Sequence, residues 1–339
     1  MIGSLMTGLL GRGALRTYPL RSPLMRTPFA PEHDALRDSV RRLVDGPLAA
    51  LAEAAERGEG VHLDALRRCD ELGLLALDDV LAEVAACEEL GRLRSGGLVA
   101  LLLDAMLAED LGVKDAEGPV AIVHDARTVT VGDGLSCELP FVVGGLLARR
   151  CVLLDQGLLL HCDQGWHADA VAAPHALRGG AVAAVRLDGA PAKPVDVAPA
   201  AIRRHELREA AAAVGAARAA FDGAAAYAQQ REAFGRPIAR FQVNRHALAE
   251  IATYVTAAHA LVHDTAWRWV RGDTVDPAAA RLYSARVAVA AADRSLQLHG
   301  GYGYTTAFDA QRAWRDARAL LPNLPALRPR LADHQGTAR

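Results

Sequence analysis

Histidine and cysteine side chains in two parts of this 339-residue sequence have types and spacing that could hold a metal ion. His259 and His263 are four residues apart, which places both imidazoles on one face of a helix. No glutamate accompanies them in a His-Glu-x-x-His pattern. His161, Cys162 and His167 lie close together, but their segment is typical of a strand and turn, and no further ligand is evident. We therefore expect structural roles for both groups and no metal site.

Composition excludes several other kinds of chemistry. A net charge of −2 with 51% hydrophobic residues gives no basic surface for nucleic acid. Neither a serine nucleophile elbow nor a glycine-rich phosphate loop with lysine is present. The cysteines are odd in number and lack a Cys-x-x-Cys pair, which favours neither a disulfide framework nor a zinc site. They indicate thiols in a reducing compartment, so a cytoplasmic location is expected. The cysteines are Cys69, Cys87, Cys137, Cys151 and Cys162.

The most informative feature is a pair of stretches, QREAFGRPIARFQ at 230–242 and QLHGGYGY at 297–304. Taken alone, each is unremarkable. Arg231 at a helix end is typical of a solvated cap, and Gln297 is typical of a helix surface. Gly300–Gly301 after a helix is typical of a C-cap. Any chemistry must therefore come from their combination.

The elements that position these stretches follow from the hydrophobic periodicity. Apolar residues recur at three- and four-residue spacing from about 31 to 113 and again from about 202 to 318, which predicts helices. Long helices are expected over 205–230, 241–271 and 277–299. Short apolar runs from about 119 to 197, punctuated by glycine, aspartate and proline, predict a small β domain. The order helical, β, helical is an α+β layout of three domains.

We expect five parts in the chain: a disordered extension (1–28), an N-terminal helical domain (29–115), a shortened β-barrel-like middle domain (116–200), a C-terminal four-helix-type domain (201–325) and a tail (326–339). The extension carries arginines and no acidic residue up to Arg26, but no long apolar segment with a cleavage site follows. No stretch of about 20 apolar residues predicts a membrane span.

On this background the two stretches resemble the C-terminal helical domain of the acyl-CoA dehydrogenase family. The three-part layout resembles the family's fold from Phe29 to Arg318. The resemblance implies an enzyme that desaturates an acyl-CoA thioester with FAD bound at a subunit interface. In the family, one chain supplies a flavin-ring loop and the catalytic base, and its neighbour supplies an arginine for the pyrophosphate.

The resemblance also implies roles for single residues. Arg231 would hold the FAD pyrophosphate, a task suited to the planar fork of donors on a guanidinium. Phe234 would lie against the cofactor, and Gln242 would reach its adenosine half. The other contacts from this chain would come from Gln297, Gly300 and Gly301. Glycines suit this position because a backbone without side chains lets the cofactor approach closely.

Two parts of the family's active site are missing. The Thr-Glu-Pro loop and the Gly-Ser-Asp after it, which bind the isoalloxazine ring in the family, have no counterpart at 118–127. The position of the usual catalytic glutamate, shortly after Arg315–Arg318, aligns with Leu324. A leucine cannot accept a proton.

Some members of the family carry the base on the long helix before the pyrophosphate arginine. That position falls at His205, with Glu206 and Glu209 beside it. His205 would then titrate near neutral pH. The alternative is that Arg203–Glu209 is the charged, solvated start of a helix, because its acids and bases alternate with surface spacing.

The flavin-ring loop and the base, which a subunit of the family supplies to its own active site, are missing. The residues that it supplies to its neighbour's active site are present. The chain most resembles the short, degenerate subunits of α2β2 actinobacterial acyl-CoA dehydrogenases that act on steroid side chains. We therefore expect a non-catalytic subunit that shares FAD with a full-length homologue in a hetero-oligomer. Two alternatives remain, namely a self-sufficient homo-oligomeric enzyme with His205, Glu206 or Glu209 as base, and a flavin-free scaffold protein.

Overall fold

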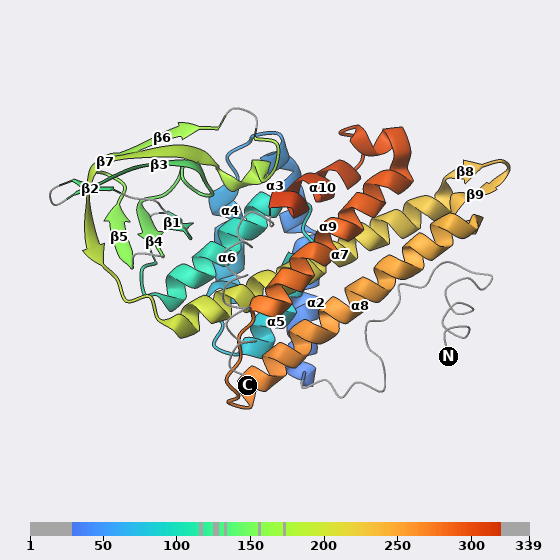
Figure 1. The fold of residues 1–339 in the computed structure, drawn as a ribbon, viewed down its shortest axis with the longest axis horizontal. Helices are drawn as coiled ribbons and strands as arrows, with labels where there is room; N and C mark the ends of the chain where they lie inside the picture. The colour runs from blue at the N-terminus through green and yellow to red at the C-terminus, as the bar shows by residue number, and fades with distance from the viewer. Residues whose placement is uncertain are drawn as a thin grey trace, which may run out of the picture.

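The computed structural model describes residues 29–319 apart from 115–117, 125–128, 132–133, 155–156 and 172–173. Figure 1 shows a curved sheet beside a helical bundle in which three long helices run alongside one another. This arrangement confirms the predicted α+β fold class. The extension 1–28, Leu324 and the tail 326–339 lie outside the described residues.

The N-terminal part is a set of packed helices: α2 (Pro31–Asp45), α3 (Pro47–Glu56), α4 (His62–Glu71), α5 (Val80–Leu90) and α6 (Gly96–Asp110). Prolines begin α2 and α3, where a helix does not need the missing N–H. The Asp79 carboxylate caps α5 by accepting a hydrogen bond from the Leu81 amide at 2.9 Å. Every residue of α5 is buried, because helices from both ends of the chain pack around it.

The middle part is a sheet of β1 (Val120–Val123), β2 (Val129–Val131), β3 (Gly134–Val142), β4 (Arg150–Leu153), β5 (Leu158–His161), β6 (Trp166–Ala170) and β7 (Ala183–Pro194). Its described strands are ordered β1-β4-β5-β7-β3-β2, and β6 also pairs with β7. Buried and exposed residues alternate along the first half of β7, so one face of the sheet covers an apolar core. In contrast, β1 is buried along its whole length and leads directly to His124.

The C-terminal part contains α7 (Pro199–Gln230), α8 (Gln242–Val270), α9 (Ala278–His299) and α10 (Ala310–Ala319). The three predicted long helices are therefore confirmed. The first begins at Pro199 rather than near His205, because the first turn of a helix accommodates proline. A hairpin of β8 (Glu232–Ala233) and β9 (Arg236–Pro237) and the 3-10 turn η3 (Ile238–Arg240) connect α7 to α8. The 3-10 turn η4 (Gly300–Tyr304) follows α9.

Small residues allow α5 and α7 to approach closely. A Cβ on Gly215 would lie 2.0 Å from the backbone oxygen of Glu88, and one on Gly91 would lie 2.0 Å from that of Ala212. The helices before and after the sheet share one hydrophobic core, which extends from Val40 to Ala317. Across the described residues, no helix is both long enough and apolar enough to cross a membrane.

Candidate functional site

The first candidate site is the end of the bundle from which the β8–β9 hairpin projects (Figure 1). Arg231 is the C-cap of α7, and its backbone amide donates to the Tyr227 carbonyl at 2.8 Å. The Ile238 amide donates to the Arg231 carbonyl at 2.8 Å and closes the hairpin. Arg231 therefore does cap a helix, while its side chain remains exposed.

The hairpin turn presents Phe234 to solvent. Phe234 and Gly235 have φ angles of 52° and 71°, the left-handed pair that a type I′ turn requires. Asparagine and glycine adopt this conformation readily, whereas phenylalanine is strained in it. The Phe234 side chain is also 95% exposed, with its ring 6.3 Å from that of Phe241. Strain combined with exposure of an aromatic ring indicates a functional role rather than a structural one.

The second sequence stretch meets the first at this end of the bundle. The guanidinium carbon of Arg231 lies 5.6 Å from the centre of the Tyr302 ring in η4. Beneath them, Leu298 of α9 packs with Ile238 and Leu248 in a small hydrophobic cluster. We call the exposed residues here the hairpin face, which consists of Arg231, Phe234, Gln242, Gln297, Gly300, Gly301 and Tyr302.

The two glycines of the hairpin face differ in whether their backbone conformation requires glycine. Gly300 is the C-cap of α9, with φ 58° and ψ −138°, a conformation that side chains essentially exclude. At Gly301, an added Cβ would meet nothing within 4 Å. The described part of the chain therefore explains Gly300, whereas Gly301 leaves bare backbone that a ligand or another chain can approach.

The second candidate site is a cavity of about 710 Å³ inside the chain. Residues of α6, α7, α9 and α10, together with the end of β1, line it, and most of these residues are apolar. The volume is within the range of small-molecule sites.

Polar side chains from three helices and the β1 end gather on the wall of this cavity. The rings of His124 and His205 stack with centroids 5.6 Å apart. Arg281 places Nε 2.7 Å from Oε2 of Glu209 and donates through Nη2 to Oε1 at 3.1 Å. Asp104 of α6 also faces the cavity. Sequence reasoning found His205 and Glu209 but missed the other three, which come from distant parts of the chain.

Burial controls protonation in this cluster. His205 is 2% exposed, and burial lowers its pKa to about 3 although Glu209 opposes the shift. The predicted titration of His205 near neutral pH is therefore wrong. Burial, supported by the charge of Glu209, raises the pKa of Asp104 well above its usual range. Burial also opposes ionisation of Glu209, but Arg281, His205 and His124 outweigh it and lower the pKa of that carboxyl.

The alternative interpretation of Arg203–Glu209 as a solvated helix start is also wrong. Arg208 is 1% exposed and lies 2.7 Å from Asp110 of α6 in an ion pair. Glu206 is 4% exposed, and its Oε1 lies 3.9 Å from Nη1 of Arg281. These charged residues pair with groups on neighbouring helices. Their spacing in the sequence is the same as that of solvated charges, so the sequence does not distinguish the two cases.

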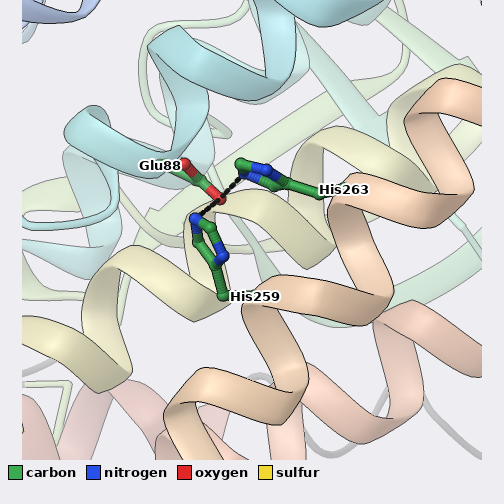
Figure 2. Close-up of side chains that lie close together, drawn as sticks. All are labelled: Glu88, His259 and His263. Atoms are coloured by element: carbon green, nitrogen blue, oxygen red, sulfur yellow. Dashed lines mark hydrogen bonds and ion pairs between the residues drawn. The ribbon is translucent and has the colours of Figure 1, made fainter. Parts of the chain in front are cut away.

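His259 and His263 do have a carboxylate partner, which comes from another helix. Figure 2 shows Glu88 of α5 pointing between the two imidazoles of α8. Its Oε1 lies 2.8 Å from Nε2 of His263 and 3.6 Å from Nε2 of His259. Its Oε2 accepts a hydrogen bond from Arg37 at 2.9 Å. Burial lowers the pKa of His259 to about 4, against the opposing effect of Glu88.

His161, Cys162 and His167 lie at the β5–β6 turn, as the sequence predicted. Both histidines are exposed, and burial raises the pKa of the Cys162 thiol to about 12. Among the described residues, two other groups have converging metal ligands, namely Glu88 with His259 and His263, and Asp104 with His124 and His205.

Comparison with known proteins agrees with this fold. Residues 196–321 match the family described as acyl-CoA dehydrogenase, C-terminal domain. The 3-(aryl)acrylate reductase of Clostridium sporogenes is 41% identical over 113 residues, which are 33% of this chain and 30% of that protein. The chain thus matches about a third of the length of such curated relatives.

Solved structures match over most of the chain at lower identity. Acyl-CoA dehydrogenase from Geobacillus kaustophilus is 19% identical, with 90% of this chain and 99% of that chain covered and a TM-score of 0.75. A glutaryl-CoA dehydrogenase from Mycobacterium smegmatis in complex with FADH2 is 17% identical, with 87% and 91% covered and a TM-score of 0.71. The chain therefore has the acyl-CoA dehydrogenase fold, and residues 196–321 match the model of that family's C-terminal domain.

Proposed function

We propose that this chain, whose C-terminal part is an acyl-CoA dehydrogenase domain, is a non-catalytic subunit that completes the FAD site of a full-length partner. The hairpin face carries the proposal. It exposes a guanidinium, an aromatic ring and bare glycine backbone together. These are the groups that bind a pyrophosphate and an aromatic ring system.

The residues present fit FAD in chemical terms. FAD bound here would supply the hydride acceptor for α,β-desaturation of an acyl-CoA thioester. Arg231 would hold the pyrophosphate, and its cation–π contact with Tyr302 would limit the directions in which the guanidinium can point. Phe234 would cover the cofactor. Gln242 and Gln297 would donate hydrogen bonds, while the backbone at Gly300 and Gly301 would allow close approach.

The interior of the chain supports the non-catalytic assignment. Glu209 is held by two nitrogens of Arg281, and His205 has a pKa of about 3, so both are weak bases at neutral pH. The segment in which the family has its flavin-ring loop forms buried β1 and the β1 end at His124. The base and the flavin-ring loop would therefore come from the partner.

The finer assignment rests on the resemblance to short subunits of α2β2 acyl-CoA dehydrogenases. We propose a hetero-oligomer with a full-length homologue, acting on the CoA-activated side chain of a steroid. Comparing turnover of such a thioester with that of a straight-chain acyl-CoA by the purified complex tests the substrate class.

A second candidate is a self-sufficient enzyme, which the 710 Å³ cavity with its polar cluster favours. Co-expression separates the two. The chain produced alone should be colourless, whereas the chain co-purified with a full-length acyl-CoA dehydrogenase encoded in the same genome should give a yellow, active complex. A yellow, active homo-oligomer of this chain alone would refute the subunit assignment.

A further inference from the structure

We propose that Asp104, His124 and His205 form a binding site for a divalent first-row transition metal on the wall of the cavity. The three side chains come from α6, the end of β1 and the first half of α7. Each offers one ligand atom, and these atoms lie within 4.8 Å of one another. Two imidazoles and one carboxylate are a donor set that suits zinc or ferrous iron.

The spacing of the donor atoms requires only a small adjustment. Ligand atoms about 2.1 Å from a tetrahedral ion are about 3.4 Å apart. Side-chain rotations toward the cavity can bring atoms within 4.8 Å to that separation, because open space borders all three residues.

The site also contains one buried polar atom without a hydrogen-bond partner. His205 is only 2% exposed, and its Nδ1 is buried without a hydrogen-bond partner. Asp104 is 8% exposed, and it faces the cavity. Buried groups of this kind are destabilising unless something binds them. A cation would satisfy this nitrogen and would also bind the Asp104 carboxylate.

The surrounding charges leave room for a cation. Arg281 is matched by Glu209, and Arg208 is matched by Glu83 and Asp110. Neither guanidinium therefore contributes uncompensated positive charge. Glu209 also lies 3.9 Å from Nε2 of His205, where a carboxylate can orient a metal-bound imidazole.

The Glu88–His259–His263 group has the same donor types, and Nδ1 of His263 is also buried without a hydrogen-bond partner, but the group differs in its carboxylate and its surroundings. Its carboxylate is already bonded to His263 through Oε1 and to Arg37 through Oε2 (Figure 2). A cation bound here would have to break the contact between Glu88 and His263 and would lie beside the guanidinium of Arg37. None of its three members lines the 710 Å³ cavity. This group therefore serves as an internal control.

The metal would be accessible from the cavity. Three protein ligands leave a coordination position open, as in catalytic rather than structural zinc sites. That position would face the 710 Å³ space, where a ligand oxygen could complete the coordination. The ion would polarise a carbonyl group bound there.

Cobalt titration tests the site. The full chain, stripped of metal with a chelator, is titrated with Co²⁺ while visible absorption and bound metal per chain are measured. We expect saturation at one ion per chain. Asp104→Asn and His205→Gln should each weaken binding by more than the roughly 10–100-fold that loss of an outer-shell partner causes. The matched control, His259→Gln, should bind Co²⁺ like the unmodified chain.

Circular dichroism of each variant verifies that it remains folded, and Asp104→Asn keeps the shape of the side chain. Absence of binding, or binding that survives both substitutions or is lost in the control, would overturn the proposal. The titration uses neither FAD nor a partner chain. A chain that binds no Co²⁺ would therefore not contradict the proposed function. A complex that retains no FAD would likewise not contradict the metal site.

Discussion

The guanidinium of Arg231 lies over the ring of Tyr302 at 5.6 Å, although one residue follows α7 and the other follows α9. The contact joins two stretches that separately resemble ordinary helix ends. Because the small cluster around Leu298 fixes both helix ends, the hairpin face is formed before any ligand arrives.

Arg231→Ala should lower FAD retention in the complex with the partner by roughly 10–100-fold, because a hydrogen bond to a charged group contributes about 1.5–3 kcal/mol. Assembly and thermal stability should not change, since the side chain is exposed. The matched control is Arg268→Ala, which removes the same charge near the other end of α8. Flavin content per complex is the measurement. Equal flavin loss in both variants would contradict the role of Arg231.

Phe234→Asn should separate stability from cofactor binding. Asparagine relieves a left-handed backbone conformation that disfavours phenylalanine, so the chain should gain up to about 1 kcal/mol of unfolding free energy. FAD retention should fall because the exposed ring is lost. Phe234→Tyr is the control and should preserve both properties. Denaturant unfolding and flavin content are measured together, and a stabilised variant with full flavin retention would show that the ring has no role in binding.

Gly215→Ala should destabilise the chain by about 1–3 kcal/mol or more, since its Cβ would lie 2.0 Å from the backbone oxygen of Glu88. Gly223→Ala, in the same helix, meets nothing within 4 Å and should stabilise by up to about 1 kcal/mol. Urea unfolding of both variants measures the difference. Similar effects of the two substitutions would mean that α5 and α7 are farther apart than described.

Acid should destabilise the chain through His259. Its pKa is about 4 in the folded state and about 6.5 when unfolded, so the unfolded chain binds the proton first. The stability contributed by the neutral side chain is complete above pH 6.5 and is lost as the pH falls toward 4. The groups that oppose protonation, besides burial, are His263, Arg37 and Arg218, while Glu88 favours it.

The measurement is the unfolding free energy as a function of pH. His259→Gln should reduce the slope between pH 6.5 and 4 by up to about 1.4 kcal/mol per pH unit, the value for one proton. The control variant is His167→Gln, which removes an exposed histidine from the sheet. Equal slopes for all three proteins would show that His259 is not the titrating group.

Sequence reasoning succeeded where local patterns decide the outcome. Hydrophobic periodicity located the long helices, and the QREAFGRPIARFQ stretch put Arg231 at a helix end, although the hairpin that follows it was not predicted. Both depend on residues close together in the chain. The first long helix was predicted to start near His205 rather than at Pro199, because proline is compatible both with a connecting segment and with the first turn of a helix.

The interior could not be predicted in the same way. Glu88 approaches His263 from another helix, and His124 reaches His205 from the sheet. Such pairings depend on tertiary packing, which no local spacing records. The charged run Arg203–Glu209 was interpreted as solvated because a buried ion pair and a surface one have the same sequence pattern until the partner, such as Asp110, is known.

The complete burial of α5 has a consequence for how the chain folds. The helices that surround α5 come from both sides of the sheet in sequence, so a nascent chain cannot bury it until α7 and α8 have been synthesised. Unfolding of the two helical parts should be a single cooperative transition, and folding should be slowed by the long loop that must close first. A fragment that ends before α7 would expose α5 and aggregate rather than persist as an independent domain.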